Sequence, residues 1–481
     1  MPGPIVPELR KAAISLNIVV VGAGIAGIAT AYALRRVGHD VTVLEQNDTL
    51  IKVRVSPPNM TRILYQWGLE HILSKNAQVS NKIRLFEAST SELLGAIVLH
   101  EEFLKQMFLL DMLILEHGDL ISLLYDLACN AGVQFQFGSK VTEVIGLDGM
   151  DGSHHCIVLT ETSHRQCDVV VGADGPTGSV RSVITGLRSE QFSVSDLTLN
   201  WVVPVEEILD DDDLKPLAQT TDWNVWLGDG YRLSVTTMNH GRDLDVSMNY
   251  RLDSIDAPFS LSELDASKLY PIGHFKLPLG RFHPVLRKLC IHARNVRAMK
   301  YLSQPVLDTF ICERPRVVLV GEAAHPLMPA GLHNSGLGIE DAQSLATLFS
   351  RVQSRDHLAQ LITAFDDIRQ SRCTFAQEWD LTKYKLFTLA PGPEQEARNY
   401  KFKKGFLNKE WENMDEAALQ EVWQDEFALF SYDAIEKAED WWTKWGWLAR
   451  RASMVPDMEG SDDEGGDFPV MPSFQISVHK G

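Results

Sequence analysis

The chain has 481 residues, of which 45% are hydrophobic and 23% charged, and its formal net charge is −19 at pH 7. This length allows two or three structural units with cores of their own, and the composition is that of an ordinary globular enzyme. The acidic excess argues against nucleic acid or an anionic membrane as partner, because both require clustered Lys and Arg.

Other sequence features bear on location and metal binding. No apolar run is as long as a membrane span, and the N-terminus carries Arg10 and Lys11 without the apolar segment of a secretion signal, so we expect a cytoplasmic protein. The six cysteines include no C-x-x-C pair and accompany no histidine cluster at zinc spacing, which favours buried thiols. The acidic run at 210–213 is expected to be a solvated turn. We therefore predict no metal site.

A glycine-rich turn follows the first strongly apolar run. Residues 18–21 read Ile-Val-Val-Val, which is typical of a buried parallel strand, and a helix is expected from about residue 28 to 37. Between them stand Gly22, Gly24 and Gly27. At this spacing they allow a tight turn, a close approach of the backbone to a pyrophosphate, and close packing of helix on strand. The helix N-terminus then faces the phosphates with free N–H groups.

Glu45 closes the next apolar run, 41–44, where a carboxylate can accept hydrogen bonds from a ribose diol. Strand, turn, helix and acid together predict a dinucleotide site, and a purely structural glycine turn is the alternative. The motif alone does not choose between FAD and NAD(P).

The pattern of apolar and polar residues divides the chain into units. Continuous apolar strands recur at 167–172 and 316–321, whereas residues 192–305 hold short strands and polar connections typical of an antiparallel sheet. Six or more helical turns, rich in aromatic residues, are expected within 414–450. The expected division is a discontinuous first domain at 17–190 and 306–350, a second at 191–305, a helical region at 351–455 and a flexible acidic tail at 456–481.

Three strand-and-turn signals occur in order: 22–27, then Asp174-Gly175 with Arg181 shortly after, then Gly-Glu-Ala-Ala-His-Pro at 321–326. This combination resembles the class A FAD-dependent monooxygenases, aromatic hydroxylases similar to salicylate and para-hydroxybenzoate hydroxylase, over roughly residues 17–375. The resemblance implies an α/β fold with a Rossmann-like FAD-binding domain, an antiparallel-sheet substrate domain and a helical C-terminal region. It also implies FAD as cofactor, NADPH or NADH as reductant, and O2 as co-substrate.

The resemblance also implies roles for single residues. Asp174 and Gly175 contact FAD and NAD(P)H, and Glu322, in place of the family's Asp, reaches a ribityl hydroxyl of FAD. Arg181 is expected to serve the Asp-Gly loop by pairing with it or by contacting NAD(P)H.

The segments that face the flavin ring depart from the family pattern. A Gly-Ala-Gly segment is replaced by residues 51–55, where Arg54 either contacts FAD or lies in a solvated loop. His117 stands where the family has a cofactor-contacting Arg. In the Gly-rich helix start, Gly331 is kept and Asn334 stands near an expected glycine. Asn334 is a good N-cap, so this helix can still aim its dipole at the flavin.

Candidate catalytic residues follow from the same comparison. Some members carry an Arg and a Tyr on the substrate sheet, at places that correspond to Asn200 and Thr236 here. His333, at the flavin side of the helix start, is an acid/base candidate because histidine exchanges protons near neutral pH. His325 is instead expected to make a structural hydrogen bond in its turn. For Trp201 and Trp226, pocket lining and core packing both stay open.

We expect a monooxygenase that hydroxylates or epoxidises a bulky aromatic or polycyclic small molecule in specialised metabolism, with a homodimer as a possible assembly. The altered flavin-facing segments leave a second hypothesis, a non-redox cyclase or isomerase on the same fold. A catalytically silent binding protein is the third.

Overall fold

The computed structural model describes residues 10–47, 58–80, 82–98, 113–114, 117–148, 154–186, 192–252, 261, 264–312, 316–328, 333–407 and 424–452. Residues 51–55 with Arg54, Gly331 and the acidic tail at 456–481 lie outside these ranges. His117 begins a helix, but its side chain also lies outside the description.

The first sheet carries the glycine-rich turn. Its strand order is β18 (Ile311–Cys312), β19 (Val317–Leu319), β11 (Val169–Gly172), β1 (Asn17–Val21), β2 (Asp40–Leu44) and β7 (Gln134–Gln136). All neighbours are parallel except β18 and β19. Ile18 to Val21 are buried, as expected of a strand covered on both faces.

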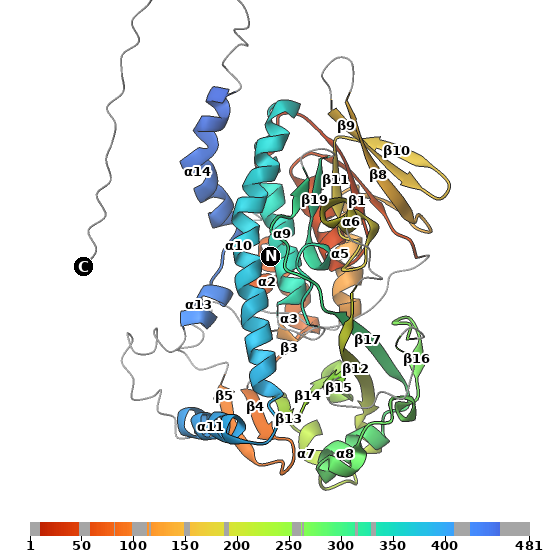
Figure 1. Ribbon diagram of the computed structural model, residues 1–481, viewed down its shortest axis with the longest axis vertical. Coiled ribbons are helices and arrows are strands. Elements are labelled where there is room, and N and C mark those ends of the chain that lie inside the picture. Colours follow the sequence, from red (N-terminus) through yellow and green to blue (C-terminus); the bar gives the residue numbers. More distant parts are fainter. Residues whose placement is uncertain are drawn as a thin grey trace, which may run out of the picture.

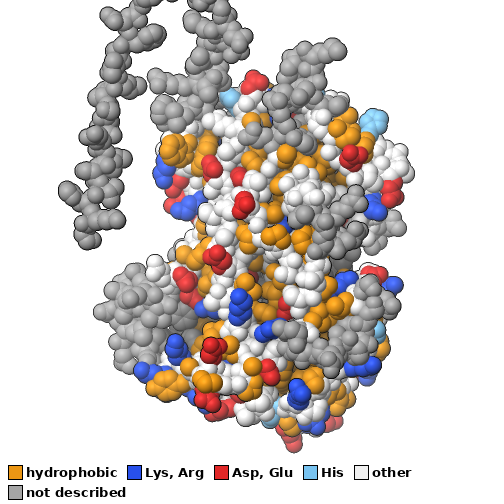
Figure 2. Space-filling model, in the orientation of Figure 1, with side chains coloured by type: hydrophobic (Ala, Val, Ile, Leu, Met, Phe, Trp, Pro, Cys, Tyr) orange, Lys and Arg blue, Asp and Glu red, His pale blue; other side chains and the backbone are white. Residues whose placement is uncertain are grey.

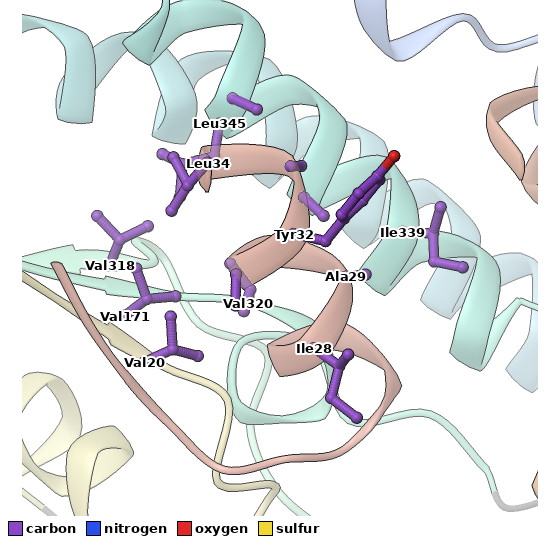
Figure 3. Close-up of a cluster of buried hydrophobic side chains, with 14 of the residues drawn as sticks. Val20, Ile28, Ala29, Tyr32, Leu34, Val171, Val318, Val320, Ile339 and Leu345 are labelled. Carbon is purple, nitrogen blue, oxygen red and sulfur yellow. The ribbon is translucent and has the colours of Figure 1, made fainter. Parts of the chain in front are cut away.

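Helices α1 (Ile25–Arg36), α5 (His117–Asn130) and α9 (Asn334–Phe349) belong to this unit. Val20, Val171 and Val318 of the sheet face apolar side chains of α1, and α1 packs in turn on Ile339 and Leu345 of α9 (Figure 3). Because α1 is packed between the first sheet and α9, its position is fixed, and so is the position of the glycine turn that precedes it.

The second sheet has eight strands. Their order is β16 (Leu269–Tyr270), β17 (Val296–Leu302), β12 (Val194–Pro204), β15 (Asp243–Arg251), β14 (Tyr231–Met238), β13 (Trp223–Gly228), β4 (Lys82–Glu87) and β5 (Leu93–Val98). Neighbours are antiparallel except β13 and β4, which are parallel.

The membership of β4 and β5 differs from the expected division of the chain. We expected all of 17–190 in the first domain, whereas residues 82–98 extend the second sheet by pairing with β13. The edge of β13 supplies unpaired backbone groups that β4 satisfies. Such pairing between distant segments leaves no local pattern in the sequence.

The two faces of the second sheet differ in chemistry. Leu199, Trp201 and Leu233 lie in an apolar core shared with α8 (Pro284–Ile291). The indole Nε1 of Trp201 donates to the Leu289 carbonyl at 3.1 Å, and Trp226 stacks on Phe86 with ring centroids 5.0 Å apart. Both tryptophans are therefore core residues, which decides between the two alternatives.

The remaining elements are smaller or C-terminal. They are β3 (Gln78–Val79) paired with β6 (Leu113–Ile114), the sheet of β8 (Val141–Asp148), β9 (His154–Thr160) and β10 (His164–Cys167), and the helices α2 (Pro58–Gln66), α3 (Glu70–Asn76), α6 (Ser179–Thr185), α7 (Lys215–Ala218), α10 (Leu358–Phe387), α11 (Pro393–Phe402), η10 (Lys403–Leu407), α13 (Gln424–Phe430) and α14 (Ala434–Ala452).

The helical turns expected within 414–450 form two helices in the described residues, α13 and α14, and Asp433 caps the second of them. Its Oδ1 accepts the backbone N–H of Ile435 at 2.9 Å and of Glu436 at 3.1 Å.

Helix α10 connects the two units. It has 30 residues, so it is about 45 Å long, and Figure 1 shows it passing α9 and ending near β13 and β4. At its far end the Tyr384 hydroxyl donates to Asp196 Oδ1 of β12 at 2.7 Å. Among the described helices, none is both long and apolar enough to cross a bilayer.

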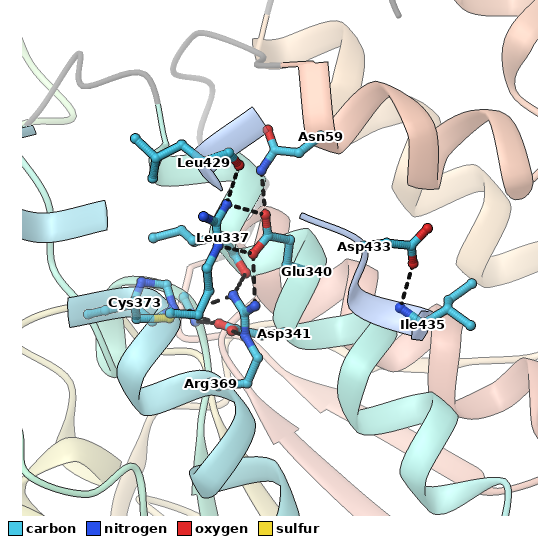
Figure 4. Close-up of polar contacts among 12 residues, drawn as sticks. Asn59, Leu337, Glu340, Asp341, Arg369, Cys373, Leu429, Asp433 and Ile435 are labelled. Atoms are coloured by element: carbon cyan, nitrogen blue, oxygen red, sulfur yellow. Dashed lines mark hydrogen bonds and ion pairs between the residues drawn. The ribbon is translucent and has the colours of Figure 1, made fainter. Parts of the chain in front are cut away.

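A buried ionic cluster fastens α10 to α9 (Figure 4). Arg369 of α10 donates to Glu340 at 2.8 Å and to Asp341 at 2.8 Å, and Arg372 donates to Glu340 at 2.9 Å and to the Leu429 carbonyl of α13 at 2.6 Å. Asn59 of α2 also donates to Glu340. The four charged side chains (Arg369, Arg372, Glu340 and Asp341) are all buried. Their contacts fix the positions of α2, α9, α10 and α13 relative to one another.

Candidate functional site

The three glycines of the turn meet different surroundings. A Cβ on Gly22 would lie 2.4 Å from the Ala173 carbonyl oxygen, and one on Gly27 would lie 2.0 Å from the Gly22 carbonyl oxygen. A Cβ on Gly24 would meet no heavy atom within 4 Å. Gly22 and Gly27 are thus fixed by packing, whereas Gly24 faces open space at the N-terminus of α1. That space can admit a pyrophosphate.

Glu45 closes the same edge of the sheet. Its Oε2 accepts the Ala23 N–H at 2.7 Å, and its Oε1 accepts the Asn47 N–H at 2.9 Å. The carboxylate therefore ties the glycine turn to the end of β2. It stands where the sequence predicts a ribose.

Asp174 follows β11 at the same edge. Its Oδ2 accepts the Val180 N–H of α6 at 3.0 Å, while Oδ1 is buried without a hydrogen-bond partner in the described part of the chain. Burial raises the pKa of Asp174 above its ordinary value. Gly175 beside it has φ +80° and open space around its Cα. The unpaired Asp174 Oδ1 can accept a hydrogen bond from a hydroxyl group of a ligand, and the open space at Gly175 leaves room for that ligand.

Among the described residues, Arg181 donates to the Gly-Glu-Ala-Ala turn and not to Asp174 or Gly175, which corrects the expected pairing with the Asp-Gly loop. Its Nη1 donates to the carbonyls of Ala323 at 2.5 Å and Ala324 at 3.1 Å, and burial lowers its pKa to about 10. Its role is to draw α6 against the Gly-Glu-Ala-Ala turn, because those carbonyls lie on that turn.

The Gly-Glu-Ala-Ala turn and α9 meet through Asn334. Its Nδ2 donates to Glu322 Oε1 and to the Met328 carbonyl, both at 3.2 Å. The N-cap of α9 is His333, so the expectation that Asn334 caps this helix is wrong. Asn334 Oδ1 is a second buried acceptor without a partner among the described residues. It lies at the helix start that the resemblance places beside the flavin.

His325 is held inside the protein, as its structural interpretation requires. Its Nε2 lies 2.6 Å from Asp341 Oδ2, and the same oxygen accepts the Gly321 N–H at 2.8 Å. Burial alone would lower the pKa of His325, but the Cys373 sulfur and the Asp341 carboxylate outweigh it and raise that pKa to about 10. The pKa of Asp341 falls to about 2, because His325 and Arg369 outweigh its burial.

We expect His325 to make stability pH-dependent. Its folded-state pKa of about 10 exceeds the ordinary value, so its contribution is complete below about pH 6.5 and is lost as pH rises through 10. Chemical unfolding of wild type and His325→Gln at several pH values measures this. The difference between them should shrink by a few kcal/mol, on the order expected for such a shift, towards pH 10. A difference that does not change with pH contradicts the assignment.

His333 lies in a closed polar and aromatic setting. Its Nδ1 is 3.0 Å from Asp380 Oδ1 of α10, its ring stacks on Phe430 at 5.4 Å, and Trp379 meets it edge-on at 5.3 Å. His333 and Asp380 are both buried. Within the described ranges, His333 Nε2 and Asp380 Oδ2 have no hydrogen-bond partner.

Asn200 lies on the polar face of the second sheet, opposite its apolar core. It is half-buried and pairs in register with Ser247 and Arg297. Arg232 is on the same face, where its Nη2 donates to Asn249 Oδ1 at 2.8 Å and Asn249 Nδ2 donates to Thr198 at 2.8 Å.

Sequence reasoning missed Arg232 and Asp380. The alternation of 231–236, apolar at odd and polar at even positions, places Arg232 on the polar face and could have found it. Asp380 had no such signal, because its partner is 47 residues away on another helix.

Charged side chains of both signs lie on the same face of the molecule. On the face shown in Figure 2, basic and acidic side chains of the described residues are interspersed. A phosphate backbone would require a continuous basic stripe.

The sequence is similar to that of known FAD-binding proteins. Residues 15–215 match the family model described as FAD binding domain. FAD-dependent monooxygenase OpS4 of Beauveria bassiana (strain ARSEF 2860) is 23% identical over 430 residues, which cover 88% of this chain and 96% of that protein.

Solved structures share the fold. CtdE in complex with FAD and substrate 4 has a TM-score of 0.72 at 16% identity, covering 91% of this chain and 100% of that one. A salicylate hydroxylase substrate complex has a TM-score of 0.67 at 17% identity, covering 88% of this chain and 97% of that one. These comparisons confirm the expected fold class and FAD as the cofactor. The glycine turn and the matched domain identify residues 15–215 as an FAD-binding domain, and over most of its length the chain is similar to FAD-dependent monooxygenases.

Proposed function

We propose that the chain uses NADPH or NADH and O2 to hydroxylate or epoxidise an aromatic or polycyclic small molecule in specialised metabolism. One observation carries this proposal: Gly24 faces open space at the edge of the first sheet, while Tyr384 of α10 attaches that helix to β12 of the second sheet. The related protein from Beauveria bassiana is a monooxygenase, which favours this function over a non-redox cyclase or isomerase.

FAD fits the residues at the edge of the first sheet. We propose that Gly22, Gly24 and Gly27 receive its pyrophosphate and Glu45 its adenosine ribose, since open backbone and a carboxylate are what these groups require. When bound, FAD supplies the chemistry that activates O2.

The remaining cofactor contacts lie farther along the same edge. The orphan Oδ1 of Asp174, with Gly175 beside it, and the Glu322–Asn334 pair would hold the ribityl chain and the flavin ring. His117 and Gly331 stay proposals on the resemblance alone.

We propose that His333 takes a proton from a hydroxyl of the substrate, with Asp380 as its positioning residue. A carboxylate only accepts, so Nδ1 carries the hydrogen and Nε2 keeps a lone pair. An ionised hydroxyl makes a ring more reactive towards electrophilic oxygen. Asn200 and Thr236 cannot accept such a proton, although Asn200 can orient the substrate on the polar face.

A chromogenic phenol tests His333 without knowledge of the natural substrate. When 4-nitrophenol is titrated into the FAD-loaded protein at about pH 6, we expect its phenolate absorption band to appear on binding. His333→Gln should reduce that band about 10-fold at saturation, which is the effect of raising the pKa of the bound phenol by about one unit. His283→Gln, a matched change at the N-cap of α8, should leave it unchanged. Binding without a phenolate band in the wild type would rule out His333 as the base.

The proposed domain division assigns 17–190 and 306–350 to FAD, 191–305 to the substrate and 351–455 to the helical region, with 82–98 now placed with the substrate sheet. We also propose that the protein acts in the cytoplasm and can form a homodimer, for which the exposed Trp445 on α14 offers an apolar contact.

The direct experiment uses the purified full chain. FAD at 100 times its dissociation constant should stabilise the fold by about 2.7 kcal/mol, measured by thermal shift. NADPH and NADH are then added separately under anaerobic conditions, and one of them should bleach the flavin, with O2 consumption on exposure to air. A protein that FAD does not stabilise, or whose flavin neither nucleotide reduces, would overturn the proposal.

A further inference from the structure

Two cysteines stand directly opposite each other in the three-stranded sheet. The antiparallel register of β9 and β10 pairs Cys156 with Cys167. Opposite residues in such a ladder have Cα atoms about 4.5–5.5 Å apart, with both side chains on one face. Disulfides span Cα separations of about 4.4–6.8 Å. The backbone therefore already has the spacing that a cross-strand disulfide needs.

The two thiols are free and interact with each other. Both are buried, and each sulfur also faces a carbonyl: Cys156 Sγ lies 3.8 Å from the Arg316 oxygen, and Cys167 Sγ lies 3.8 Å from the Cys156 oxygen. The hydrogen bond between the thiols lowers the pKa of Cys156 and raises that of Cys167 well above its ordinary value. Cys156 thus has the greater thiolate character, which makes it the nucleophile of the pair.

A polar cavity provides access to this pair. Its volume is about 360 Å³, and its lining includes Cys167, Arg165, Gln134 and Arg35. It adjoins residues 17–19 of β1 and 40–42 of β2, whereas the glycine turn follows the other end of β1. A small hydrogen-bonding oxidant can therefore reach Cys167 without passing through the candidate FAD site, and the Cys156 thiol that it must oxidise is the hydrogen-bond partner of the Cys167 thiol.

We propose that Cys156 and Cys167 form a peroxide-sensitive dithiol that closes to an intramolecular disulfide. The Cys156 thiolate attacks one oxygen of hydrogen peroxide, the O–O bond breaks, and hydroxide leaves and is protonated to water. The resulting sulfenic acid is attacked by Cys167, the S–O bond breaks, and a second water leaves as the S–S bond forms. Two thiols lose two electrons, and one peroxide is reduced to two waters.

The position of the pair gives the disulfide a structural consequence. Cys167 is followed by Asp168, whose carboxylate accepts the Asn17 N–H at the start of β1 at 2.9 Å and Arg355 Nε at 2.8 Å. A bridge between β9 and β10 would fasten the small sheet to this anchor. Oxidation is therefore expected to raise the melting temperature rather than to unfold the protein.

Peptide mass spectrometry of the native, full-length protein tests the proposal. After treatment with hydrogen peroxide and alkylation of the remaining thiols, we expect a peptide pair linked through Cys156 and Cys167, lighter by two hydrogens and released by dithiothreitol. Buried Cys290 and Cys373 should be recovered alkylated. Cys167→Ser should leave a sulfenic acid on Cys156 that dimedone traps, and Cys156→Ser should leave Cys167 unoxidised.

Cys290→Ser is the matched control, since it also removes a buried thiol and should leave the bridge intact. The proposal is overturned if both thiols of the wild type are recovered alkylated while exposed Cys129 is oxidised. It is equally overturned if Cys167 bridges to another cysteine. The wild-type digest decides the matter even if a serine variant does not fold.

Discussion

Arg369→Met is expected to lower the free energy of unfolding by about 3–5 kcal/mol, because removing one partner of a buried ion pair leaves the other charge uncompensated. Arg369 is fully buried and is hydrogen-bonded to both Glu340 and Asp341. After the change Arg372 still pairs with Glu340, whereas Asp341 keeps only His325 as a charged partner. Urea unfolding followed by circular dichroism measures the loss.

A second arginine, which also pairs with a carboxylate but is exposed, tests whether burial is the cause of the expected loss of stability. Arg294 also pairs with a carboxylate, Glu207, at 2.9 Å, but its side chain is 74% exposed and that of Glu207 is 21% exposed. Arg294→Met is expected to cost at most about 1 kcal/mol, as is usual for solvent-exposed pairs. Equal losses in the two variants would contradict the view that the cluster around Arg369 fastens α10 to α9.

Gly24→Ala and Gly27→Ala are expected to affect FAD binding and folding differently. Gly24 has φ −75°, which any residue can adopt, and its added methyl group would enter open space. The ligand-free stability should therefore stay within about 0.5 kcal/mol of wild type. The methyl group would nevertheless occupy the space proposed for the pyrophosphate. We expect FAD affinity to fall about 100-fold, or about 2.7 kcal/mol.

Gly27→Ala places its methyl group against the Gly22 carbonyl, so the turn itself must open. Overpacking of this kind costs about 1–3 kcal/mol even without ligand, and FAD binding should be lost as well. Thermal unfolding of the ligand-free variants and FAD fluorescence titrations measure both quantities. If Gly24→Ala binds FAD like the wild type, the pyrophosphate does not lie at Gly24.

Local patterns were sufficient to predict the first sheet. The apolar runs of β1, β11 and β19, each followed by a turn with a glycine or an acid, give a parallel sheet with its polar edge on one side. The short strands and polar connections of residues 192–305 likewise predicted the antiparallel second sheet, to which β12, β14 and β15 belong. These features depend only on residues close together in the chain.

Features that depend on distant pairs were not predictable in this way. Residues 82–98 join a sheet otherwise formed after residue 194, and the partners of His333 and Asp196 both come from α10. The cap of α9 was misassigned by one residue, because Asn334 finds partners in Glu322 and Met328 that the sequence does not place nearby. In each case tertiary contacts decided between locally acceptable alternatives.

The length of α10 has a mechanical consequence. This single continuous helix is attached to α9 beside the first sheet by the ionic cluster and to β12 of the second sheet by Tyr384, so it keeps the two sheets at a fixed distance. A hinge motion that separates the first sheet from the second would have to break the ionic cluster or the hydrogen bond between Tyr384 and Asp196. Reactants are therefore expected to enter and leave by rearrangement of short connecting segments, with the scaffold itself standing still.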